Sequence, residues 1–157
     1  MKNKFIFKNC INNKVSVSMN FNKGEITTIS KSTYSEQYFD DLQREFEGYK
    51  WYSEYQPIEV KLKKNDIFNN MELSIQYIKG NKKKFNKGIS NNFDAIMLAI
   101  SYYNSISNLE FSKTKKLPFH GDFSIDNIIY KKNNLYIIDW QYFHFSEFYR
   151  GFDILNL

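Results

Sequence analysis

Cysteine and glycine are scarce in this chain, and each shortage excludes a kind of site. Cys10 is the only cysteine among 157 residues, so the chain can form no internal disulfide and no zinc site built from several cysteines. The 6 glycines are scattered, and no segment matches a glycine-rich phosphate-binding loop. The turn Asn9–Asn13 is the segment left for that role, because asparagine tolerates left-handed backbone conformations.

Long apolar runs are also missing. The first apolar stretch, Phe5–Phe7, is followed at once by Lys8, which is too early for the core of a signal peptide. No segment approaches the roughly 20 apolar residues that a helix needs to span a bilayer. Together with the single cysteine, these absences predict a cytoplasmic protein without a membrane span.

Apolar and basic residues, by contrast, are plentiful. The chain is 42% hydrophobic, with 15 Phe, 12 Tyr and 2 Trp, which is enough to build the core of one domain or of two small lobes. Its net charge is +5, and lysine runs lie at 61–64, 82–84 and 113–116. We interpret these runs as solvated segments, because no basic and aromatic residues alternate as in a nucleic-acid-binding module. Nucleic acid is therefore not the expected partner.

The first half of the chain predicts an antiparallel sheet with one helix. Alternating apolar residues and flanking turn residues indicate strands at Phe5–Phe7, Val15–Phe21, Glu25–Ser30, Ile58–Leu62 and Glu72–Ile78. Asn22–Gly24 predicts a hairpin turn. Apolar residues spaced three and four apart predict a helix to about Tyr52, with Ser35 as its cap.

The second half predicts a helix followed by a short hairpin. A polar stretch at Gly80–Ser90 is the expected boundary between two lobes. An apolar face predicts a helix over Asn92–Ser107. Two short apolar runs, Ile128–Tyr130 and Leu135–Ile138, predict strands on either side of the turn Lys131–Asn134.

Polar residues with a recognisable spacing surround this predicted hairpin. The segment His120–Asn127 contains Asp122 and Asn127 five residues apart, and Asp139 follows twelve residues later in Ile-Ile-Asp-Trp. Phosphoryl transfer needs one carboxylate that accepts the proton of the nucleophile, and an amide and a second carboxylate that bind magnesium across the phosphates. The hairpin would bring Asn127 and Asp139 together at its open end.

These motifs resemble those of the aminoglycoside phosphotransferase and choline kinase family, which is related to the protein kinases. Members carry His-Gly-Asp or His-Asn-Asp in the first motif and Ile-Asp-Trp or Ile-Asp-Phe in the second, as at His120 and Ile138. The resemblance implies Asp122 as catalytic base and Asn127 with Asp139 as ligands of Mg²⁺. It implies a structural role for His120.

The same resemblance extends to the first half of the chain. It implies a lysine on the third strand and a glutamate on the following helix that together position the phosphates of ATP. Lys31 at the end of a predicted strand and Glu45 on the predicted helix fit, with Glu47 as a competing choice. Ile75–Gly80 resembles the connector that binds adenine, and its contacts with the base are expected from Gln76, Tyr77 and Ile78.

The end of the chain is most similar to the choline and ethanolamine kinase branch. Tyr149-Arg-Gly-Phe-Asp-Ile154 carries this likeness, and it implies that Asp153 supports the catalytic loop. Relatives continue beyond the position of Leu157 into helices of the acceptor pocket. We therefore expect an abbreviated C-terminal lobe: a truncated reading frame, a compact variant completed by a partner chain, or an inactive remnant.

Together these patterns predict an α+β fold of the protein-kinase-like, two-lobe kind. Residues 1–79 would form the nucleotide-binding lobe, and residues 80–157 a helical catalytic lobe that carries the hairpin. The expected activity is transfer of the γ-phosphoryl group of ATP, with Mg²⁺, to a hydroxyl of choline or ethanolamine, or else of a sugar or an aminoglycoside. The alternative is a catalytically inactive module that binds nucleotide or a partner.

Overall fold

The computed structural model describes residues 2–10, 14–80, 89–131 and 134–147. The chain is a mixed α/β protein that divides into two compact units, unit 1 (Met1–Tyr77) and unit 2 (Ile78–Leu157). The division falls two residues before the predicted boundary after residue 79.

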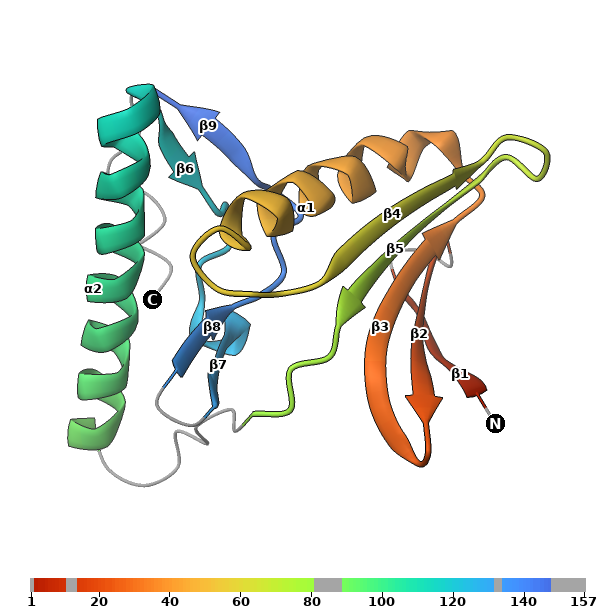
Figure 1. Ribbon diagram of the computed structural model, residues 1–157, viewed down its shortest axis with the longest axis horizontal. Coiled ribbons are helices and arrows are strands. Elements are labelled where there is room, and N and C mark those ends of the chain that lie inside the picture. Colours follow the sequence, from red (N-terminus) through yellow and green to blue (C-terminus); the bar gives the residue numbers. More distant parts are fainter. Residues whose placement is uncertain (1, 11–13, 81–88, 132–133, 148–157) are drawn as a thin grey trace. The chain divides into compact units, whose positions relative to one another are not determined.

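Unit 1 is built on one five-stranded antiparallel sheet (Figure 1). Its strands are β1 (Lys2–Cys10), β2 (Val15–Asn22), β3 (Glu25–Thr33), β4 (Val60–Asn65) and β5 (Asn70–Gln76), in the spatial order β1-β2-β3-β5-β4. The order places β1 and β4 at the two edges.

A two-residue turn joins β2 to β3. Lys23 and Gly24 both have positive φ, 51° and 82°, and Asn22 pairs with Glu25 across the turn. Two consecutive left-handed residues match the right-handed twist of the flanking strands. The predicted hairpin is therefore present, although the positive φ falls on Lys23 and Gly24 and not on Asn22.

The two faces of the sheet differ in polarity. Strand register places Val17, Lys31, Leu73 and Leu62 in one row, and Met19, Ile29, Ile75 and Val60 in the next. The opposite face carries small polar side chains: Asn20 Nδ2 donates to Thr28 Oγ1 (2.8 Å), and the hydroxyls of Ser30 and Ser74 lie 3.0 Å apart. These hydrogen bonds satisfy polar groups on the second face, including the fully buried Ser30.

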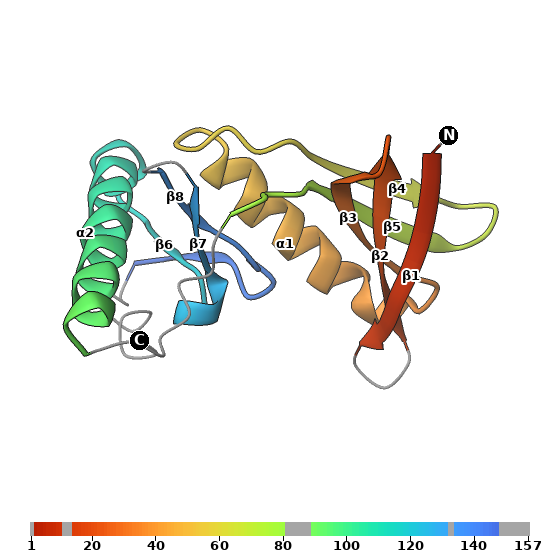
Figure 2. The same cartoon turned by 90° about the horizontal axis from the view of Figure 1, so that it is seen from below.

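Helix α1 (Phe39–Tyr52) packs against β4 and β5 on the apolar side of the sheet (Figures 1 and 2). It follows the 3-10 turn η1 (Glu36–Tyr38). Ser35 precedes η1, but its side chain makes no capping hydrogen bond, so the prediction of Ser35 as the cap of the long helix is wrong. Leu42, Tyr49 and Tyr52 are buried along the inner face of α1.

Unit 2 contains one long helix and two short antiparallel pairs. Its elements are α2 (Ile89–Thr114), β6 (Leu117–Phe119), η2 (Ile125–Asn127), β7 (Ile128–Lys131), β8 (Asn134–Ile137) and β9 (His144–Ser146). β7 pairs with β8, and β6 pairs with β9. The predicted hairpin is present, whereas β6 and β9 were not predicted and α2 is seven residues longer at its end than the predicted helix.

Buried aromatic rings form the centre of unit 2. The rings of Tyr103 on α2 and Phe123 stack at 4.6 Å, and the ring of Trp140 lies 4.4 Å from that of His120. The hydroxyl of Tyr103 donates to the carbonyl of Pro118 at 3.1 Å, which ties α2 to β6 (Figure 2). Two residues of the predicted catalytic loop, His120 and Phe123, are therefore part of this core.

Among the helices of the described residues, none is long and apolar enough to cross a membrane.

Substituting one isoleucine in each of two environments tests the apolar side of the sheet. Ile75 is 7% exposed on β5, and Ile67 is 88% exposed in the turn after β4. We expect Ile75→Ala to lower the free energy of unfolding by about 2–5 kcal/mol, since it removes buried methyl groups and leaves a cavity. Ile67→Ala should change it by less than about 0.5 kcal/mol. Urea denaturation measures both, and equal effects would contradict the described core.

Candidate functional site

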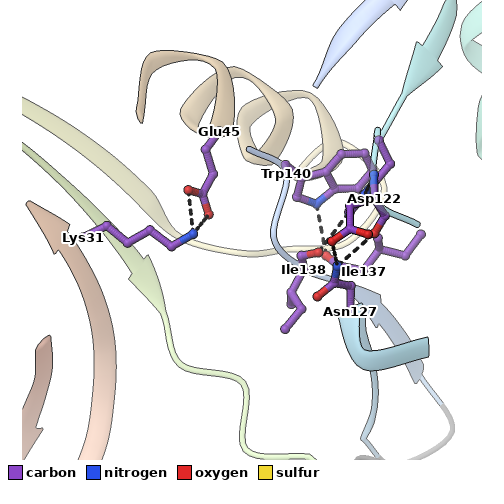
Figure 3. A network of polar contacts seen from close by, with 8 residues as sticks. Lys31, Glu45, Asp122, Asn127, Ile137, Ile138 and Trp140 are labelled. Atoms are coloured by element: carbon purple, nitrogen blue, oxygen red, sulfur yellow. Dashed lines mark hydrogen bonds and ion pairs between the residues drawn. The ribbon is translucent and has the colours of Figure 1, made fainter. Parts of the chain in front are cut away.

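Lys31 and Glu45 form a partly buried ion pair in unit 1, in which the Lys31 side chain is 20% exposed. Lys31 Nζ lies 2.8 Å from both Oε1 and Oε2 of Glu45 (Figure 3). Lys31 lies within β3, not at the strand end as predicted, and the pleat directs it to the apolar face. The Glu45 side chain is 2% exposed, so the carboxylate depends on the ammonium group for compensation of its charge.

The competing residue Glu47 does not take this place. Its carboxylate accepts a hydrogen bond from Gln43 Nε2 at 2.8 Å on the exposed side of α1. Glu45 and Glu47 are two residues apart, and two helical positions at that spacing point in different directions. The helix geometry therefore selects Glu45 as the partner of the strand lysine.

The predicted catalytic loop in unit 2 contains Gly121, at a position where no side chain larger than hydrogen fits. Gly121 has φ of +83°, and a Cβ built there would lie 2.3 Å from Cβ of Tyr142. Both the backbone conformation and the close approach of Tyr142 exclude other residues. Gly121 thus allows the loop to pass in close contact with Tyr142, in the segment that follows Asp139.

His120 links the two predicted motifs. Its Nε2 lies 2.9 Å from the carbonyl oxygen of Ile138, and its Nδ1 lies 3.3 Å from the amide nitrogen of Asp122. A carbonyl can only accept and an amide can only donate, so Nε2 carries the proton and Nδ1 accepts. The fully buried imidazole therefore holds the residue before Asp139 and the backbone of Asp122 at the same time.

The side chain of Asn127 is fixed by Asp122. Its Nδ2 donates to the carbonyl oxygen of Asp122 at 2.8 Å and to Asp122 Oδ2 at 3.1 Å (Figure 3). Because the nitrogen is used in this way, Oδ1 is the Asn127 atom suited to a cation. The carboxylate of Asp122 is in turn oriented by the amide.

The β7–β8 hairpin brings the ends of the two motifs side by side. Ile128 pairs with Ile137, and the amide of Ile138 donates to the carbonyl of Asn127 at 2.9 Å. Asp139 follows immediately and has a φ of +67°, which is uncommon for a residue with a side chain. Aspartate is among the residues that adopt this left-handed conformation most readily.

The chemistry of these side chains fits a magnesium ion that is shared with phosphate. The described residues contain no group of three or more His, Cys, Asp or Glu able to hold a metal by themselves. Magnesium is commonly held by one or two protein ligands together with phosphate oxygens and waters. Asn127 Oδ1 and the Asp139 carboxylate are the two groups here that would supply such a small set.

The predicted adenine-binding segment lies at the end of β5 and just after it. The amide of Gln76 donates to the carbonyl of Glu59 at 2.8 Å, and the amide of Tyr77 donates to Thr27 at 2.8 Å. Both amides therefore donate to acceptors within unit 1. Ile78 is the first residue of unit 2.

Some of the predicted residues cannot be located, and some contacts were not predicted. Asp153 and residues 11–13 of the proposed phosphate turn lie outside the described residues. The contact between Gly121 and Tyr142 and the role of the Ile138 carbonyl were missed. No sequence pattern reveals a backbone carbonyl as the partner of a histidine, although a glycine between His120 and Asp122 hints at a close approach.

A search with models of known protein families finds no match to this chain, and a search of curated proteins finds no relative.

Removal of Lys31 tests the ion pair in unit 1. Lys31→Met removes the ammonium group that faces the buried Glu45 carboxylate, so we expect the free energy of unfolding to fall by about 2–3 kcal/mol, less than for a fully buried pair. The double variant Lys31→Met/Glu45→Leu should recover most of that loss, because both charges are removed. Urea denaturation provides the measurement.

The exposed pair Arg44 and Asp41 on the same helix serves as the control. Arg44→Met should change the free energy of unfolding by less than about 0.5 kcal/mol, because water screens an exposed pair. A loss for Lys31→Met as small as that for Arg44→Met would contradict the described burial.

Alanine at Gly121 tests the close approach in the loop. Gly24 has the same sign of φ, +82°, but no atom lies within 4 Å of an added Cβ. Gly24→Ala should therefore cost only about 1 kcal/mol for the left-handed backbone. Gly121→Ala adds the overlap with Tyr142 and should cost about 3 kcal/mol or more. Fluorescence-monitored urea denaturation, with Trp51 in unit 1 and Trp140 in unit 2, compares them; equal losses would refute the contact.

Proposed function

We propose that this protein is a phosphotransferase with a protein-kinase-like fold, which moves the γ-phosphoryl group of ATP to a hydroxyl of a small molecule. Its proposed relatives are the aminoglycoside phosphotransferases and choline kinases, and choline or ethanolamine is the first acceptor to consider. Unit 1 would be the nucleotide-binding lobe, and unit 2 would be the catalytic lobe.

The observation that carries this proposal is the joined set of contacts around Asp122. His120 fixes the backbone of Asp122, Asn127 orients its carboxylate, and the hairpin sets Asp139 directly after a residue bonded to Asn127. A base, an amide and a second carboxylate held by one small network are what positioning and metal-assisted phosphoryl transfer require.

The ion pair in unit 1 provides independent support. The resemblance required a lysine on the third strand and a glutamate on the next helix, and Lys31 and Glu45 lie on β3 and α1 at 2.8 Å. In this role the glutamate orients the ammonium group, which binds the α- and β-phosphates. The five-stranded antiparallel sheet with a helix between its third and fourth strands agrees with such a lobe.

The proposed step is an in-line displacement. The acceptor hydroxyl loses its proton to the Asp122 carboxylate, and its oxygen forms a bond to the γ-phosphorus. The bond between that phosphorus and the β–γ bridging oxygen breaks, so ADP leaves with the electron pair. Mg²⁺ held by Asn127 and Asp139 would offset the charge on the phosphate oxygens.

The choice of acceptor rests on the segment after Asp139. Trp140 is buried in the core and cannot face a ligand, whereas Tyr142 and Phe145 are exposed. Aromatic faces bind ammonium groups such as those of choline and ethanolamine. A sugar hydroxyl and an aminoglycoside are the next candidates, and a partner chain that completes the acceptor pocket belongs to the proposal. Location in the cytoplasm, where ATP is abundant, would suit this activity.

A second candidate function is a catalytically inactive module that binds nucleotide or a partner. Binding of Mg-ATP without any turnover would favour this function.

Turnover assays with Asp122→Ala test the proposed base. ADP release would be measured with Mg-ATP and choline, ethanolamine, simple sugars or an aminoglycoside. We expect acceptor-dependent release that Asp122→Ala reduces by about 10²-fold or more, because a positioned base contributes at least that factor, while ATP affinity is retained. Asp126→Ala, an exposed carboxylate in the same loop, is the matched control and should stay active.

Calorimetric titration separates the base from the metal ligand. Asp139→Ala should weaken binding of Mg-ATP, whereas Asp122→Ala should not, because of these two carboxylates only Asp139 is proposed to contact the ion. Turnover that survives in Asp122→Ala would remove this residue from the base role. Unchanged Mg-ATP affinity in Asp139→Ala would remove Asp139 from the metal site.

A further inference from the structure

Strand β7 supplies no donor to the last two carbonyl groups at the end of β8. The final pair of the hairpin is Ile128 with Ile137. The amide of Ile138 donates to the carbonyl of Asn127 just beyond this pair, so the N–H and C=O groups of Ile128 and Ile137 point away from each other. The amide of Asn127 donates to Ser124 instead. The carbonyls of Ile137 and Ile138 therefore need donors from outside the hairpin.

Two buried rings supply these donors. Trp140 Nε1 donates to the carbonyl of Ile137 at 3.1 Å, and His120 Nε2 donates to that of Ile138 at 2.9 Å (Figure 3). Both rings are fully buried, and their centroids lie 4.4 Å apart. The carbonyl of Ile137 and the amide of Ile138 belong to one planar peptide group. Trp140 therefore holds one side of this group, and Asn127 holds the other.

The indole bond also closes a turn around Asp139. Ile137 and Trp140 are three residues apart, so Asp139 lies inside the turn that their bond closes. Asp139 has a φ of +67°, a left-handed conformation that costs energy in an L-amino acid. On the other side, the amide of Phe143 donates to the carbonyl of Trp140 at 3.0 Å and closes the next turn. The backbone is thus fixed both before and after Asp139.

We propose that Trp140 is a positioning residue that presets the left-handed backbone of Asp139. Its indole N–H orients the peptide group that leads into the turn, and its ring packs on His120. Trp140 itself touches neither the ion nor the nucleotide. The consequence for Mg²⁺ rests on the proposed function, in which Asp139 is a metal ligand. Contacts that orient a metal ligand typically contribute tenfold or more to metal affinity.

A side chain that only filled the core would behave differently. Loss of its N–H would lower the free energy of unfolding but leave the backbone of Asp139 unchanged. Tyr103 provides the matched comparison, because it is an aromatic residue of the same core and is 4% exposed. Its hydroxyl also donates to a backbone carbonyl at 3.1 Å, that of Pro118. This carbonyl belongs to β6 and not to the turn around Asp139.

Nuclear magnetic resonance of the full chain without nucleotide tests the positioning directly. Trp140→Phe and Tyr103→Phe each remove one donor and keep an aromatic ring. We expect Trp140→Phe to move the backbone carbon resonances of Asp139 away from left-handed values. It should also speed hydrogen exchange of the Ile138 amide by about tenfold, because the shared peptide group is no longer held. Tyr103→Phe should change neither property.

A second variant separates the N–H from the volume of the ring. Benzothienylalanine at position 140 has the shape of tryptophan but carries sulfur in place of the N–H group. It keeps the core filled, and we expect it to change Asp139 as Trp140→Phe does. Resonances of Asp139 equal to those of the unchanged protein would overturn the proposal.

Calorimetric titration with Mg-ATP, and with ATP in the presence of a chelator, measures the consequence for the metal. The benzothienylalanine variant should bind Mg-ATP about tenfold more weakly, and metal-free ATP as the unchanged protein does. Unchanged affinity for Mg-ATP, or an equal loss in Tyr103→Phe, would overturn the proposal. Failure of the unchanged protein to bind Mg-ATP would contradict the proposed function instead, and the resonances of Asp139 would still decide whether Trp140 sets its backbone.

Discussion

The buried imidazole of His120 fixes the geometry of unit 2. One ring nitrogen holds the carbonyl before Asp139, and the other holds the amide of Asp122. The ring is buried beside Trp140, so water cannot replace either partner. Because one nitrogen must donate and the other must accept, only the neutral ring serves both bonds. Two loops whose contacting residues, His120 and Ile138, lie 18 residues apart in the chain are thereby held together.

A second, partly buried polar contact organises unit 1 in a comparable way. Lys31 lies in a row of apolar residues on β3, where an ammonium group without a partner would be costly. Glu45 compensates its charge from α1 and thereby also sets the position of the helix over the sheet. Replacement of a buried ion pair by apolar residues of similar size often leaves the stability of a protein unchanged or raises it. Stability alone therefore does not explain why this pair is present. In the proposed nucleotide-binding lobe, the pair would position the α- and β-phosphates of ATP.

Much of this arrangement could be predicted from local sequence. Alternating residues indicated β2 and β5, the turn Asn22–Gly24 indicated the hairpin, and the motif His120–Asn127 indicated that Asp122 and Asn127 lie in one loop, where they share a hydrogen bond. Pairing over long distances could not be predicted, so β6 and β9 were missed. The end of α2 was missed because Leu109 and Phe111 are exposed and do not continue the buried stripe. Nor could a pattern of residue types reveal the positive φ of Asp139, which depends on the surrounding contacts.

The central claim is the proposal that Asp122, Asn127 and Asp139 form the phosphoryl-transfer site of unit 2. Hydrogen–deuterium exchange of the full chain, with Mg-ATP and with ATP plus a chelator, tests this most directly. The account predicts that Mg-ATP slows exchange in the segment from Asp122 to Asp139. The chelator should remove this protection. No protection of this segment with Mg-ATP at saturating concentration would contradict the account.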